Sequence, residues 1–180
     1  SKTNKEKISK YFKFKKALNS HLKQFKQHEL KTLYLLSIEN SSELCTVLNS
    51  SFIQLQELIS NPIYVQYDIQ KKKGGIRQIF APENHLKVVQ KKLNNLLQSY
   101  YLWIKPSEVY GFIIKPDYID TPCNIVENAK NHVKKKQVLN IDLKDFFPSI
   151  TAKRVRELFL SPYFNFNENI ATALALLTTY

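Results

Sequence analysis

Val138-Leu139-Asn140-Ile141-Asp142-Leu143-Lys144-Asp145-Phe146-Phe147-Pro148-Ser149-Ile150 is the most informative stretch of this 180-residue chain. Its first residues alternate between apolar and polar, which predicts a buried strand that ends on Asp142. A turn with two adjacent aromatic residues, Phe146 and Phe147, follows at once. Burying a carboxylate is costly unless a cation or hydrogen bonds compensate it, so Asp142 is a candidate ligand of a divalent cation.

This arrangement suits polymerase chemistry, which needs a fixed carboxylate for a divalent cation and a flat side chain beside the incoming sugar. The alternative for Asp142 is a capping or turn aspartate. A turn alone, however, has no use for two adjacent aromatic residues. Asp145 is explained more simply as a turn residue, with only a modest part in metal binding.

The composition points to an anionic partner. The chain carries 27 Lys and Arg against 15 Asp and Glu, a net charge of +12, and such an excess is typical of proteins that bind nucleic acid. The alternatives are a basic surface that only confers solubility, or an anionic membrane as partner. No apolar run approaches the roughly 20 residues that cross a bilayer, so we expect a soluble protein. Cys45 and Cys123 lack metal-type spacing and fit a reducing, cytoplasmic compartment.

The order of expected elements is typical of an α+β fold. A basic helical region, residues 1–60, comes first, and its lysines form either a solvated face or a nucleic-acid contact. A β-hairpin over residues 64–80 and a long helix over residues 86–100 follow. The remaining expected elements are a short helix before the strand that ends on Asp142, and two helices after it, over residues 151–160 and 167–180.

The turn of the hairpin is basic. Gly74 and Gly75 follow three lysines, Lys71 to Lys73, and precede Arg77. Because a guanidinium group binds phosphate oxygens in bidentate fashion, this tip is a candidate clamp for a triphosphate. The alternative is an ordinary exposed turn with charged residues beside it.

Four stretches together resemble motifs of bacterial reverse transcriptases, and among these the retron type. The hairpin Lys71–Pro82 and the start of the next helix resemble the fingers motif, and Val109-Tyr110-Gly111-Phe112 resembles the Gly-Phe segment that follows it. Asn128-Ala129-Lys130-Asn131-His132 has the Asn-Ala-x-x-His signature of retron enzymes. Asn140–Ile150 matches the first catalytic motif of the palm. The resemblance runs from roughly Ile63 to the end of the chain.

The resemblance implies a metal site and a side chain that selects the sugar of the incoming nucleotide. Asp142 would bind Mg²⁺ (or Mn²⁺), with the backbone carbonyl of Leu143 as a second ligand. Phe147, five residues after Asp142, would exclude the 2′-hydroxyl of a ribonucleotide and so select deoxynucleoside triphosphates.

The resemblance also implies how the triphosphate is held. Arg77 and Lys71 would bind its phosphate oxygens. Backbone amides near Asp145 and Phe146 would face the same group.

Asn128 and His132 would belong to a region peculiar to the family, which contacts the structured RNA or packs beside it. His132 also lies on the apolar side of its expected helix. A hydrogen-bonded core histidine therefore stays an equal alternative.

In the terms of this family, fingers would span residues 61–136 and the start of the palm residues 137–180, after the basic region 1–60. The family's Tyr-x-Asp-Asp motif and thumb would come later, and no two acidic residues are adjacent in this sequence. Two-metal phosphoryl transfer needs carboxylates around both ions. We therefore expect an N-terminal fragment that has no polymerase activity by itself.

The implied activity of the parent protein is RNA-directed DNA synthesis on a structured noncoding RNA, through an RNA–DNA hybrid. Anti-phage defence is the implied role, with an effector protein as a further partner. Two alternatives stay open: a non-catalytic nucleic-acid-binding half-polymerase or split subunit, and a phage-exclusion relative that extends DNA without a template.

Overall fold

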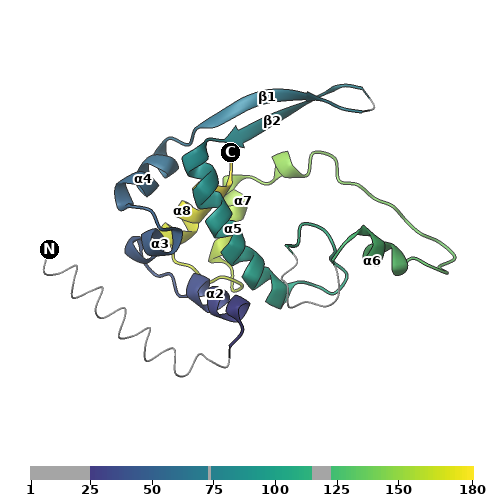
Figure 1. Cartoon of the computed structure of the whole chain (residues 1–180), viewed down its shortest axis with the longest axis horizontal. Helices are drawn as coiled ribbons and strands as arrows, with labels where there is room; N and C mark the ends of the chain where they lie inside the picture. Colours follow the sequence, from purple (N-terminus) through teal and green to yellow (C-terminus); the bar gives the residue numbers. More distant parts are fainter. Residues whose placement is uncertain (1–24, 73, 115–122) are drawn as a thin grey trace, which may run out of the picture.

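The structure, a computed structural model, describes residues 25–72, 74–114 and 123–180 (Figure 1). In chain order the elements are α2 (Gln27–Leu36), α3 (Ser41–Leu48), α4 (Phe52–Ser60), β1 (Tyr64–Gln70), β2 (Ile76–Pro82), α5 (Asn84–Ile104), α6 (Ile125–Lys130), the 3₁₀ helix η1 (Phe147–Ser149), α7 (Ala152–Leu160) and α8 (Glu168–Thr178). Helices combined with an antiparallel hairpin confirm the expected α+β class. The helices expected before residue 25 lie outside the described residues.

Side-chain caps set where several helices begin. The Asn40 side chain accepts a hydrogen bond from the Glu43 amide at 3.0 Å, which starts α3. At α4 the bonds are reciprocal: the Gln54 amide donates to Ser51 Oγ at 3.2 Å, and the Ser51 amide donates to Gln54 Oε1 at 3.0 Å. These bonds satisfy backbone donors that the first turn of a helix leaves unpaired.

α5 is the central helix of the body. Helices α2, α3 and α8 contact it, and α7 packs against α8 (Figure 1). Its buried apolar residues follow a helical period and form one face: Leu86, Val89, Leu93, Leu96 and Tyr100. Fully burying such a side chain stabilises a fold by about 1.5–3 kcal/mol. Burial, and secondarily the neighbouring Tyr163, raises the pKa of Tyr100, whose hydroxyl donates to the Tyr163 carbonyl.

One hydrophobic core joins the three regions that the sequence suggests. It contains Leu35 from residues 1–60, Leu86 from residues 61–136 and Ile170 from residues 137–180. The division of the chain into fingers and palm stays a prediction. Within the described ranges, no helix has the length and apolar character needed to cross a lipid bilayer.

The hairpin forms where the sequence predicts it. β1 and β2 pair antiparallel from Tyr64 opposite Pro82 to Gln70 opposite Ile76. Gly74 and Gly75 have φ of +86° and +89°, values that glycine adopts without a steric penalty. The hairpin extends beyond the helical body in Figure 1, and most of its side chains are exposed.

Polar and aromatic contacts fasten the base of the hairpin to the body. The Gln90 side chain on α5 donates to the Leu177 carbonyl at 2.9 Å and to the Tyr64 hydroxyl at 3.3 Å, and that hydroxyl donates to the Thr179 carbonyl at 3.2 Å. The rings of Phe80 and Tyr180 stack with centroids 4.2 Å apart. The base of the hairpin is therefore held, whereas its tip projects.

The strand predicted to end on Asp142 is not formed, and this prediction was wrong for the present structure. Residues 138–143 adopt no regular structure, and Leu139 and Ile141 are 81% and 71% exposed. They lie on a long excursion of the chain between α6 and η1 (Figure 1). A strand needs a neighbour for its amides and carbonyls, and the one sheet among the described residues is the β1–β2 pair. The alternating pattern thus has no partner here.

Candidate active site

Asp142 lies on an exposed, irregular stretch, so the expectation of a buried carboxylate was also wrong. Leu143, whose carbonyl was predicted to be a metal ligand, is exposed as well. Mg²⁺ takes oxygen ligands in a near-octahedral arrangement. No group of three or more His, Cys, Asp or Glu side chains that could hold a metal ion occurs in the described part of the chain. Asp142 and the Leu143 carbonyl supply oxygens of the right kind, but not a complete site.

A compact turn follows Asp142 and presents the paired aromatics. Asp145 has φ +53°, which aspartate tolerates better than most residues. The Ser149 amide donates to the carbonyls of Asp145 and Phe146, both at 3.1 Å, and the Ser149 hydroxyl donates to the Phe146 carbonyl at 2.6 Å. No carbonyl in the described ranges accepts the amides of Asp145 and Phe146, so both remain available to an anion.

Phe147 stands at the start of η1 with 68% of its surface exposed. Its ring contacts Phe146 edge-on, with centroids 5.4 Å apart. It also meets Phe112 from a separate segment, with centroids 5.8 Å apart and ring planes at 77°. An exposed aromatic ring supported from two sides presents a defined flat surface to a ligand.

Lys71 and Arg77 flank the turn of the hairpin, and both are exposed. Neither makes an ion pair with a described residue, so their charges are available to a phosphate. Arg77 sits opposite Ile69 in the ladder. No hydrogen bond, ion pair or ring contact in the described ranges joins the hairpin tip to residues 138–150. The structure does not bring together the two halves of the predicted nucleotide site.

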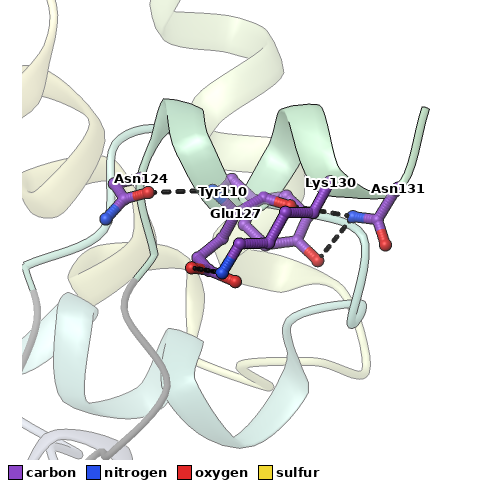
Figure 2. Close-up of polar contacts among 5 residues, drawn as sticks. All are labelled: Tyr110, Asn124, Glu127, Lys130 and Asn131. Carbon is purple, nitrogen blue, oxygen red and sulfur yellow. Dashed lines mark hydrogen bonds and ion pairs between the residues drawn. The ribbon is translucent and has the colours of Figure 1, made fainter. Parts of the chain in front are cut away.

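The retron-type signature lies at the end of α6, a short helix that Asn124 caps (Figure 2). Asn128 and His132 are both exposed, so the alternative of a core histidine was wrong. Asn131 instead makes the contact between segments: its Nδ2 donates to the Tyr110 hydroxyl at 2.8 Å. Asn128 and His132 thus remain exposed and accessible to a partner.

Sequence reasoning missed the side chains that connect these motifs. Gln98 on α5 bonds the backbone at Phe112 and Ile114, and Asn131 bonds Tyr110. A lone glutamine or asparagine carries no pattern from which such a tertiary contact could be predicted. Phe112 belongs to the Gly-Phe segment that the sequence analysis names, but its contact with Phe147 depends on the fold.

The open hollow between α3 and α4 lies apart from these residues. Its volume is about 850 Å³, and the residues that line it include Ser41, Thr46 and Phe52. None of the predicted site residues lines it. It therefore adds nothing to the candidate site.

Comparison with known proteins identifies the relatives of this chain. It is 36% identical over 116 residues to the Retron Mx65 reverse transcriptase of Myxococcus xanthus. The aligned region covers 64% of this chain and 25% of that protein. It is 29% identical over 152 residues to the Retron Mx162 reverse transcriptase of the same organism, covering 81% of this chain and 29% of that protein. The Retron Ec86 reverse transcriptase of Escherichia coli is 33% identical over 120 residues, covering 65% of this chain and 34% of that protein.

No protein-family model and no solved structure matches the chain. The chain spans about a quarter to a third of the length of the curated relatives that it matches. Several retron reverse transcriptases nevertheless agree with it over most of its own length. In sequence, the chain is therefore similar to retron reverse transcriptases over part of their length.

Proposed function

We propose that this chain provides part of the nucleotide site of an RNA-directed DNA polymerase. The observation that carries the proposal is the exposed turn that holds Phe147 five residues after Asp142, in a chain related to retron reverse transcriptases. In the reaction, a primer hydroxyl attacks the α-phosphate of a deoxynucleoside triphosphate, a new phosphodiester forms and pyrophosphate leaves.

Each predicted residue has a distinct part in this scheme. Asp142 and the Leu143 carbonyl would help to hold Mg²⁺ or Mn²⁺, which neutralises charge on the phosphates when bound. Phe147 would lie against the sugar and leave no room for a 2′-hydroxyl. Lys71 and Arg77 would bind the triphosphate from the hairpin, which must approach the turn for this to happen. The free amides of Asp145 and Phe146 would add two neutral donors to the same phosphates.

The partners we propose follow from charge and relationship. The net charge of +12 favours a structured noncoding RNA as template and the RNA–DNA hybrid that copying it creates. The exposed Asn128 and His132 would contact that RNA. We further propose a cytoplasmic protein that acts in anti-phage defence together with an effector protein.

A non-catalytic nucleic-acid-binding module is the second candidate. It is favoured by the net charge of +12, which suits a nucleic-acid partner and does not by itself require catalysis. Such a module would retain RNA but would not extend a primer.

One experiment separates these functions. The full-length protein is incubated with Mg²⁺, the four deoxynucleotides and a DNA primer, either annealed to RNA or alone. We expect DNA complementary to the RNA, and chelation of the metal should abolish it. Extension of the primer without a template would instead favour the template-independent relative. RNA binding without extension would favour the module.

A further inference from the structure

The side-chain amide of Gln98, on α5, binds the backbone of residues 112–114 at two points. Its Nε2 donates to the Phe112 carbonyl at 2.8 Å, and its Oε1 accepts from the Ile114 amide at 3.0 Å. The two bonds satisfy a carbonyl and an amide two residues apart, so the single side chain of Gln98 holds the backbone on both sides of Ile113. Exchanging its oxygen and nitrogen would break both bonds, which fixes the orientation of the amide.

A second bond ties the same segment to another element. Tyr110 accepts at its hydroxyl from Asn131 Nδ2 at 2.8 Å, at the end of α6 (Figure 2). Residues 110–114 are therefore fastened at one end to α6 and at the other to α5. A segment held at both ends places the residue between them with little freedom.

Phe112 occupies that intermediate position in an unusual conformation. Its φ is +57°, in the left-handed region that bulky residues rarely adopt. Such backbone persists only where the surroundings hold it, and here the bonds of Gln98 do so. The side chain gains almost no burial in return, since it is 87% exposed. What the conformation achieves is the edge-to-face contact with Phe147.

Phe147 needs such a support because its own turn leaves it open. Phe146, its neighbour in sequence, contacts the ring from within the turn. Among the described residues, Phe112 supplies the ring contact from another segment. The two contacts together disfavour the rotamers in which an exposed phenylalanine would swing toward the Phe112 side.

We propose that Phe112 and Gln98 are positioning residues for Phe147 and thereby set how strictly the site excludes a ribose 2′-hydroxyl. Phe112 buttresses the ring, and Gln98 fixes the backbone from which Phe112 projects. This inference rests on the proposed function, because it assigns the discrimination between sugars to Phe147.

The test compares kcat/KM for a deoxynucleotide with kcat/KM for the matching ribonucleotide, in the full-length protein. The variants are Phe112→Leu and Gln98→Met, with Phe147→Ala as reference. We expect each of the two to lower the discrimination about fivefold, the factor for an aromatic contact of ~1 kcal/mol, with kcat/KM for the deoxynucleotide little changed. Phe112→Tyr, which keeps the ring, should retain the discrimination of the unaltered protein.

Matched controls come from α4, away from this segment. Phe52→Leu removes another exposed phenylalanine ring, and Gln56→Met makes the same substitution as Gln98→Met at an exposed helical glutamine. Both should leave the discrimination unchanged. If Phe147→Ala relaxes it but Phe112→Leu and Gln98→Met behave like these controls, the inference is overturned while the proposed function stands. If Phe147→Ala has no effect, or no DNA is made, it is the proposed function that fails.

A second measurement needs no activity. In full-length protein with selectively labelled phenylalanine, nuclear Overhauser effects should connect the rings of Phe112 and Phe147, and Gln98→Met should weaken them. The Ile114 amide should also exchange its hydrogen faster in Gln98→Met. Absence of the ring contact from the unaltered protein, or its full retention in Gln98→Met, would overturn the positioning role.

Discussion

Two residues of the proposed site act in different ways. Phe147 would contact the sugar by shape, and Arg77 would bind the triphosphate by charge. The ring of Phe147 is exposed yet supported by Phe112 and Phe146. The guanidinium of Arg77 is exposed and without an ion pair among the described residues. Each can therefore be altered without breaking a structural contact to the core.

Replacing Phe147 by alanine removes the surface that would collide with a 2′-hydroxyl. We expect ribonucleotide incorporation relative to deoxynucleotide incorporation to rise by about tenfold or more, the scale on which pocket shape separates similar substrates. Steady-state kinetics of single-nucleotide addition by the full-length protein measures both rates. Phe52→Ala is the matched control, and an equal rise in that variant would point to general loosening of the fold.

Replacing Arg77 by lysine keeps the charge but removes the bidentate geometry. We expect KM for the deoxynucleotide to rise about tenfold, with a smaller change in kcat, since a charge-assisted hydrogen bond contributes roughly 1.5–3 kcal/mol. Arg156→Lys, on α7, makes the same substitution next to Glu168 and should leave KM as it was. An unchanged KM in Arg77→Lys would mean that the hairpin tip does not contact the triphosphate.

At the scale of elements, the helices form from patterns within their own sequence, whereas the expected strand at residues 138–142 would need a neighbouring strand from elsewhere in the chain. The apolar spacing of α5 predicts its buried face, because a helix satisfies its own hydrogen bonds and only its side chains need partners. The glycine pair predicts the hairpin for a similar reason, since both strands are close in sequence. Residues 138–142 have an equally clear alternating pattern, but a strand needs a neighbour, and local sequence does not say where that neighbour lies.

The cap of α4 offers a direct test of local stabilisation. Ser51→Ala removes the acceptor of the Gln54 amide and should lower the free energy of unfolding by about 1 kcal/mol. Ser42→Ala, in the first turn of α3, removes an exposed hydroxyl with no cap bond and should have a much smaller effect. Chemical denaturation monitored by circular dichroism compares them, and equal losses would contradict the assigned cap.

At the scale of the whole molecule, the net charge of +12 is consistent with the proposed nucleic-acid partner, while the predicted site is only partly assembled. Sequence motifs predict Asp142, Phe147 and the hairpin residues one by one as site residues, and these assignments stay predictions. They could not reveal that Gln98 and Asn131 link the motifs, because those links depend on how α5 and α6 lie in space. Nor do the motifs place the hairpin tip against the turn.

The positive charge predicts how RNA binding responds to salt. Neutralising phosphates releases counterions, so the affinity of the full-length protein for RNA should fall by about a thousandfold between about 50 and 200 mM salt if roughly six phosphates are contacted. Filter binding or fluorescence anisotropy measures this slope. Replacing Lys134, Lys135 and Lys136, all exposed, by glutamine should make it shallower. A slope near zero would argue against a phosphate-dominated interface.

The central claim is that Asp142 belongs to the metal and nucleotide site of a polymerase. Single-turnover primer extension on an RNA template by the full-length protein tests it most directly, with Asp142→Asn compared with Glu57→Gln, an exposed carboxylate on α4. Asp142→Asn should slow nucleotide addition by about a thousandfold or more, the scale of losing a transition-state contact of roughly 4 kcal/mol, while the protein remains folded and bound to RNA. Glu57→Gln should extend the primer normally. Extension by Asp142→Asn at the rate of the unaltered protein would contradict the account.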